Sequence, residues 1–138
     1  MAGGIDQTMA TAILAALGPN SGTKTIGTVT ITGPVKARLM TVNGTDSSAG
    51  TELATSGGYT AGGSALSMGT AATGSITNSG GATSWTNMPA TTLTGMEEWD
   101  SSATPLREFW APWSGGNISV ASGNTFTISS SGLTNSLA

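Results

Sequence analysis

Two neighbouring stretches decide the fold class: residues 23–32 read TKTIGTVTIT and residues 34–42 read PVKARLMTV. In the second stretch three apolar residues alternate with two basic ones, namely Val35, Ala37 and Leu39 with Lys36 and Arg38. A period of two is expected for a strand with one buried face. The first stretch is rich in Thr and Val, which favour strands. Gly33-Pro34 separates the two runs, so the pattern predicts strands on both sides of a turn.

Short strand candidates follow a long Gly-rich connection at residues 43–64. They lie at residues 65–68, 74–78, 83–87, 91–99, 106–110, 117–120 and 124–129. Turns that recur every ~8 to 12 residues are typical of an antiparallel β-sandwich or jelly roll. We find no tandem repeat and the strand spacing looks irregular, so we expect a compact all-β domain and not a solenoid.

The one convincing helix is expected at the start, within GIDQTMATAILAALGP at residues 4–19. Its apolar residues recur at helical spacing: Ile5, Met9, Ile13, Leu14 and Leu17. So short a helix is marginal by itself, so its stripe must dock on this protein's own sheet or, as an arm, on a neighbouring subunit. The chain therefore divides into residues 1–22, a helix or arm with a tether, and residues 23–138, the β-sandwich domain.

The composition excludes most familiar enzyme chemistry. The 138 residues include 24 Thr, 18 Ser and 21 Gly, but no His and no Cys. This composition excludes histidine-dependent catalysis, imidazole or thiolate metal sites, thiol catalysis and disulfides. Four basic residues against seven acidic ones are too few for phosphate contacts, and no apolar run approaches a membrane span. We expect no cofactor, no nucleic acid and no membrane as partners.

Four acidic residues near the middle of the C-terminal half are the candidates for chemistry: Glu97, Glu98, Asp100 and Glu108. They accompany Trp99, Trp110 and Trp113, which would suit stacking on a sugar ring, so a carboxylate-based glycosidase or a glycan site is one interpretation. In a strand, alternate residues face opposite sides. The simpler interpretation is therefore that the carboxylates are solvated and that the aromatic side chains fill the core.

Two further observations concern metals and aromatic residues. Asp46, Glu52 and Asp100 would suit calcium, but the alternating acids of an EF-hand loop are missing, so we expect no metal site. Six of the seven aromatic residues follow residue 84, which predicts a core nucleated in the C-terminal half. Trp110 and Trp113 flank Pro112, which should end a strand, and they either expose an aromatic interface or are buried within the monomer.

Several segments are distinctive in their order. They are GTE at residues 50–52, SGGY at 56–59, GSITNS at 74–79, the pair Trp99-Asp100, and ASGNTFTIS at 121–129. In this order, residues 34–138 resemble a family of small tailed-bacteriophage virion proteins, which includes head decoration proteins and proteins labelled tail fibre. The chain departs from the family pattern at residues 95–98 and 106–109, where its acidic residues replace more apolar stretches.

The resemblance implies a non-enzymatic virion protein on the outer surface of the phage head, assembled in the host cytoplasm. Its partners would be the major capsid protein and further copies of itself, with a trimer as the first expectation. The alternative is a tail or fibre component that binds a host surface glycan. The candidate interface residues are Ile5, Met9, Ile13, Leu14, Leu17, Trp110 and Trp113.

Overall fold

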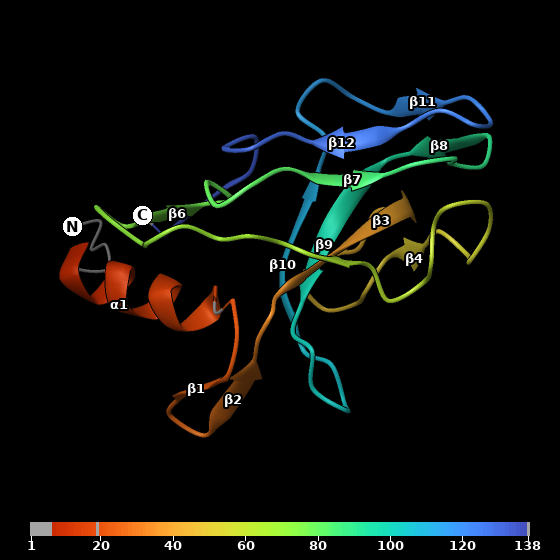
Figure 1. The fold of residues 1–138 in the computed structure, drawn as a ribbon. Coiled ribbons are helices and arrows are strands. Elements are labelled where there is room, and N and C mark those ends of the chain that lie inside the picture. The colour runs from red at the N-terminus through yellow and green to blue at the C-terminus, as the bar shows by residue number, and fades with distance from the viewer. Residues whose placement is uncertain (1–6, 19, 138) are drawn as a thin grey trace.

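A computed structural model describes residues 7–18 and 20–137, with side chains from residue 11 onward (Figure 1). Within these residues the chain is mostly β, with a single short helix near the N-terminus. All strand pairs are antiparallel. The all-β, antiparallel class that the strand patterns predicted is therefore confirmed.

The central sheet has five strands in the order β10, β9, β3 and β4, with β5 also paired to β3. Their bounds are β3 (Lys36–Val42), β4 (Thr51–Glu52), β5 (Ser64–Ala65), β9 (Gly95–Trp99) and β10 (Arg107–Pro112). The alternation along residues 35–39 is as predicted, because the apolar side chains are buried and the two basic ones only partly so. We call the side of the buried apolar residues the core face of the sheet, and the other side the outer face.

Six short strands form a long two-stranded ribbon that runs across the strands of the sheet (Figure 1). On one side lie β6 (Ser75–Thr77), β7 (Thr83–Trp85) and β8 (Thr91–Leu93), which pair in turn with β13 (Thr134–Ser136), β12 (Phe126–Ile128) and β11 (Ile118–Val120). In every pair the two residue numbers add up to 211, so one register runs through the whole ribbon.

The strands of the ribbon are evenly spaced. They begin at residues 75, 83 and 91 on one side and at 118, 126 and 134 on the other, which is eight residues apart each time. The expectation of irregular strand spacing is therefore wrong for the ribbon, although the other strands are unevenly spaced. Ser, Thr and Gly occupy strands and turns alike in this chain, so the composition concealed the period.

Several strand boundaries also differ from the predictions. Residues 91–99, expected as one strand, are divided at Thr94, whose N–H donates to the Met40 carbonyl (2.8 Å) where the chain passes from the ribbon into the sheet. The run at 23–32 is a hairpin of β1 (Thr23–Ile26) and β2 (Val29–Thr32), which turns at Gly27. The short strands β4 and β13 were missed, because two or three residues carry no measurable alternation.

Helix α1 (Gln7–Leu17) packs on the β-domain of its own chain, against β1, β6 and β13. Leu14 is 0% exposed and belongs to the single buried core cluster. Ile13 and Leu17 are partly buried, whereas Ile5 and the side chain of Met9 lie outside the described part of the chain. Of the two interpretations of the helix, packing on the protein's own ribbon accounts for Leu14.

The core combines both halves of the sequence. Tyr59 contacts Trp85, Trp85 contacts Phe126, and Phe126 contacts Trp113, with ring centroids 6.3, 5.9 and 5.6 Å apart. Buried aliphatic residues from the first half complete the cluster, among them Leu14, Val35, Leu39 and Leu53. The core is therefore shared between the two halves of the sequence, and the expectation that it is nucleated in the C-terminal half stays a prediction.

Asn78 provides a test of the ribbon, since its buried side chain fills the junction between two strand pairs. Its Nδ2 donates to the Ser129 carbonyl (2.8 Å) and its Oδ1 accepts from the Leu133 N–H (2.9 Å). Asn78→Ala leaves the Leu133 N–H without its partner and removes one donor from the Ser129 carbonyl, which also accepts from the Gly132 N–H, so the free energy of unfolding in urea should fall by about 1–3 kcal/mol. The exposed Asn117→Ala should change it by less than about 0.5 kcal/mol. An equal, small effect of both substitutions would contradict the role of Asn78.

Candidate functional site

The central strand β9 carries two of the four candidate acids, and its register places them on opposite faces. Glu97 is paired in register with Arg38, and Glu98 with Ala37, so Glu97 lies on the outer face and Glu98 on the core face. Glu97 is 1% exposed, Glu98 2%, and the following Asp100 1%. The expectation that these carboxylates are solvated is therefore wrong, and each must be stabilised from within the protein.

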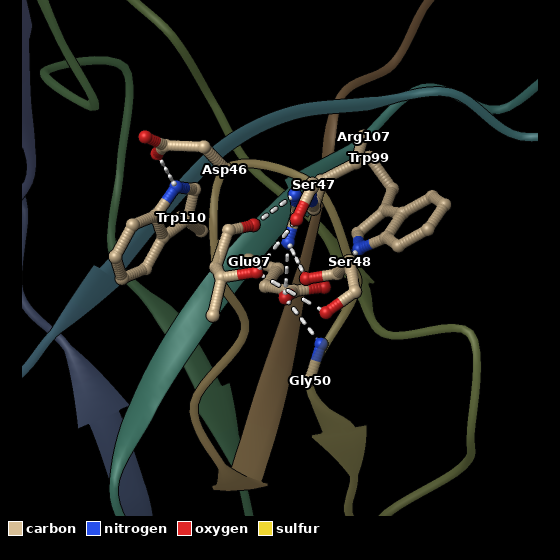
Figure 2. A network of polar contacts seen from close by, with 9 residues as sticks. Asp46, Ser47, Ser48, Gly50, Glu97, Trp99, Arg107 and Trp110 are labelled. Atoms are coloured by element: carbon tan, nitrogen blue, oxygen red, sulfur yellow. Dashed lines mark hydrogen bonds and ion pairs between the residues drawn. The ribbon is translucent and has the colours of Figure 1, made fainter.

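Glu97 is stabilised by a network that fastens a loop over the outer face (Figure 2). Its carboxylate accepts hydrogen bonds from Arg107 Nη1 (3.0 Å), the Gly50 N–H (2.7 Å) and Trp99 Nε1 (2.9 Å). Arg107 also donates to the carbonyls of Ser48 and Thr45. The ion pair therefore holds the loop of residues 43–50 against the sheet.

The predicted Asn43-Gly44 turn belongs to this loop, and it explains why a glycine is needed there. A Cβ at position 44 would collide with the carboxylate of Glu97 and the guanidinium of Arg107. At the outer end of the loop, Trp110 Nε1 donates to Asp46 Oδ1 at 3.1 Å. Figure 2 shows this contact beside the Glu97 network. The loop thus contacts both Glu97 and Trp110, and both contacts are structural.

Asp100 stabilises the turn between β9 and β10. It accepts hydrogen bonds from the N–H of Leu106 (2.7 Å), the N–H of Thr32 (3.1 Å) and the Ser102 hydroxyl (3.0 Å). Burial by itself would raise the pKa of Asp100, but these hydrogen bonds outweigh it and lower the pKa. Asp100 is therefore an ionised structural group and not a proton donor.

Glu98 and Glu108 form the unusual part of the acidic cluster. A β-bulge in β10 shifts the register between Arg107 and Phe109, and Glu108 is the bulged residue. Glu98 accepts two hydrogen bonds from Asn135 Nδ2, at 2.9 and 2.8 Å. Among the described residues, neither carboxylate oxygen of Glu108 has a partner, although both are buried. Bulges that redirect a side chain are frequent next to active sites.

Both of these carboxyl groups hold their protons more tightly than usual. Burial raises the pKa of Glu98 to about 7, against the opposing hydrogen bond from Asn135. Burial, together with the negative charges of Glu98 and Asp100, raises the pKa of Glu108 to about 8. These two groups therefore exchange protons near neutral pH, which sets them apart from Asp100.

A cleft of about 220 Å³ opens beside Glu98, between β10 and β13. Its lining combines apolar, aromatic and polar side chains: Met96, Glu98, Phe109, Trp110, Ala111, Leu133, Thr134, Asn135 and Ser136. Trp110 is 38% exposed. Of the four candidate acids, Glu98 alone lines this cleft, so it is the carboxyl group that a ligand would meet.

The residues considered for calcium are occupied elsewhere in the structure. Glu52 accepts from the Tyr59 hydroxyl (2.7 Å) and the Gly62 N–H (2.6 Å), and pairs with Arg38 at 3.5 Å. Burial and the bond to Glu52 raise the pKa of the Tyr59 hydroxyl. The part of the chain that the structure describes contains no group of three or more His, Cys, Asp or Glu side chains suited to a metal ion.

The predicted interface residues occupy different environments. Trp110 is exposed at the cleft, Trp113 is partly buried against Phe126, and Leu14 is buried in the core. Strand β10 ends at Pro112, as predicted. Sequence reasoning missed Asn135, the partner of Glu98, because an asparagine in a Ser- and Thr-rich segment carries no distinguishing pattern.

No protein-family model, no curated protein and no solved structure matches this chain. Within the described residues, the helix is too short to cross a lipid bilayer. We therefore infer the function from the cleft, the acidic side chains and the order of the sequence motifs.

The two raised pKa values predict how stability depends on pH. Between the usual pKa of about 4.5 and the folded values of about 7 for Glu98 and 8 for Glu108, the folded state binds more protons than the unfolded state. The free energy of unfolding should therefore fall as the pH rises from 5 to 9, by up to about 1.4 kcal/mol per pH unit for each group that releases its proton.

Urea denaturation at several pH values measures this dependence. The double variant Glu98→Gln, Glu108→Gln should show a much flatter profile, whereas Asp46→Asn, which removes an exposed carboxylate, should keep the slope. A stability that rises over this pH range in the unsubstituted protein would contradict the assignment.

The Glu97 network predicts a large effect of its cation. Arg107→Met leaves a buried carboxylate without its positive partner, which should lower the free energy of unfolding by about 3–5 kcal/mol. The double variant Glu97→Gln, Arg107→Met should lose less than Arg107→Met alone. Lys24→Met, at an exposed lysine of β1, is the matched control. A loss below about 1 kcal/mol for Arg107→Met would show that the loop does not depend on this pair.

Proposed function

We propose that the protein is a non-enzymatic structural component of a tailed-phage virion, which decorates the outer surface of the head by binding the major capsid protein. The order of motifs over residues 34–138 supports this proposal, as does the all-β domain with a helix packed at one end. The role calls for a stable surface and no chemistry.

The observation that carries the non-enzymatic part is the use made of the acidic residues. A glycosidase needs two carboxyl groups that face each other across the substrate. Glu97 and Glu98 lie on opposite faces of the sheet, and Glu97 and Asp100 are surrounded by structural donors. Glu108 is not among the residues that line the cleft. The cleft therefore offers one carboxyl group where hydrolysis requires a pair.

The edge of the sheet supports association with further copies or with the capsid. Among the described strands, β10 pairs only with β9, and its last three residues, 110–112, are exposed. A free strand edge invites pairing with another chain unless something covers it. A homo-oligomer, with a trimer as the first expectation, would cover this edge.

The alternative is a tail or fibre component that binds a host surface glycan. The cleft favours it, because Phe109 lies beside Glu98 there and sugar sites often combine an aromatic face with a carboxyl group. Glycan arrays distinguish this alternative from head decoration, because a decoration protein does not need to bind a sugar. Antibody labelling of virions separates head from tail directly.

The proposal predicts binding to undecorated heads of the phage that encodes the chain. The protein should co-sediment with these particles and sediment as an oligomer in analytical ultracentrifugation. Trp110→Ala should lower the bound amount about tenfold if the exposed end of β10 is the docking edge. Leu106→Ala, which removes another exposed apolar side chain from the neighbouring turn, is the control and should bind normally.

The acidic cluster supplies the second arm of this test. Glu97→Gln, Glu98→Gln, Asp100→Asn and Glu108→Gln should each leave particle binding nearly intact where circular dichroism shows normal folding. Hydrolysis of cell-wall polysaccharide by the unsubstituted protein, lost in one of these variants, would identify an enzyme. Sedimentation as a monomer that does not bind heads would reject the decoration role.

A further inference from the structure

The core face of the central sheet holds two buried carboxyl groups, those of Glu98 and Glu108, that no basic side chain of the sheet faces. The basic side chains of the sheet, Lys36, Arg38 and Arg107, lie on its outer face, as the register of β3 and the ion pair with Glu97 require. Glu98 and Glu108 lie on the other side, and their mutual repulsion adds to the cost of their burial. A positively charged group of a ligand would therefore meet no basic side chain of the sheet on this face.

The cleft provides such a group with a route. Glu98 lines the cleft, and only Asn135 Nδ2 donates to its two oxygens in the described structure. A carboxylate has about four lone-pair positions, so Glu98 keeps acceptor capacity for a further donor. Glu108, whose pKa the charge of Glu98 raises, does not line the cleft, and its two buried oxygens have no hydrogen-bond partner among the described residues. The carboxylate of Glu98 can thus accept a further hydrogen bond from a ligand in the cleft.

The rest of the lining suits an alkyl chain that ends in a positive charge. Phe109, which is paired in register with Glu98, supplies aromatic surface, and Met96 and Leu133 supply aliphatic surface. Aromatic faces attract ammonium groups, and the stem of a lysine side chain packs well on apolar surface. The cleft volume of about 220 Å³ is below the ~300–1,000 Å³ of sites for larger organic ligands. A single side chain fits this volume better than an oligosaccharide does.

We propose that the cleft between β10 and β13 binds a primary alkylammonium group, in the form of a lysine side chain of a protein partner, with the ammonium at Glu98 and the methylene chain along Phe109 and Leu133. A free diamine would bring the same chemistry, and the experiment separates the two sources. The proposal does not require the virion function, because it rests on the charge and shape of the cleft alone.

Binding of this kind must compete with protons. Below pH 6 Glu98 is mostly protonated, because burial raises its pKa to about 7, and a neutral carboxyl group attracts an ammonium weakly. A lysine amine keeps its charge up to a pH of about 10. Affinity should therefore rise between pH 6 and pH 8.5, and binding near pH 7 should release protons into the buffer.

The test uses the full chain and small probes in isothermal titration calorimetry. The probes are Nα-acetyl-lysine methylamide, putrescine, and the uncharged Nα-acetyl-norleucine methylamide as the matched control. We expect the lysine derivative to bind at least tenfold more tightly than the norleucine derivative at pH 8, and more weakly at pH 6. Tighter binding of putrescine than of the lysine derivative would uphold the cation site but reject the protein partner.

Variants and spectra locate the site. Glu98→Gln should reduce the affinity for the lysine derivative about tenfold or more, whereas Asp46→Asn, with the same change of charge on an exposed loop, should reduce it less than twofold. If Glu98→Gln fails to fold, amide chemical shifts of the unsubstituted protein decide, because the probe should perturb residues 109–111 and 133–136. Equal binding of the lysine and norleucine derivatives, or shift changes confined to other residues, would overturn the proposal.

Discussion

The burial of acidic side chains in and after strand β9 is the constraint on which the rest of the structure depends. A charged carboxylate removed from water is unfavourable by several kcal/mol unless donors surround it. Glu97 draws the loop of residues 43–50 over the outer face through Gly50 and Arg107. Asp100 draws in β2 and the turn before β10. Glu98 draws β13 onto the core face through Asn135. Three segments outside the ladder of the sheet are therefore fastened by its central strand.

The composition explains how the buried carboxylates are stabilised although the chain has only four basic residues. Four basic residues cannot neutralise seven acidic ones, and within the described part of the chain the ion pairs are Arg38 with Glu52 and Arg107 with Glu97. Backbone N–H groups, hydroxyls and one amide supply most of the remaining donors. Small residues such as Gly44 allow the backbone to approach the carboxylates closely, so the richness in Gly, Ser and Thr serves the polar network as well as the turns.

Local patterns predicted the parts of the fold that depend on local physics. The alternation of residues 35–39, the end of the helix at Leu17 and the end of a strand at Pro112 were all found. The buried state of Glu97, Glu98 and Asp100 was not predicted, because it depends on donors 10 to 68 positions away in the chain, such as Arg107, Asn135 and Thr32. The cleft was likewise invisible, since it forms where β13 reaches β10. The bulge at Glu108 has no counterpart in any sequence motif.

The even spacing of the ribbon makes its length adjustable in whole steps. One strand and one turn occupy eight residues on each side, and a single register joins all three pairs. Adding one such unit to both sides would lengthen the ribbon and leave every existing pair intact, whereas an insertion on one side would displace all pairs beyond it. Helix α1 covers the last pair, β6 and β13, and so closes the growing end. In evolutionary terms, only duplications matched on both sides would change the length of the ribbon, and they would leave the sheet with its buried acidic residues unchanged.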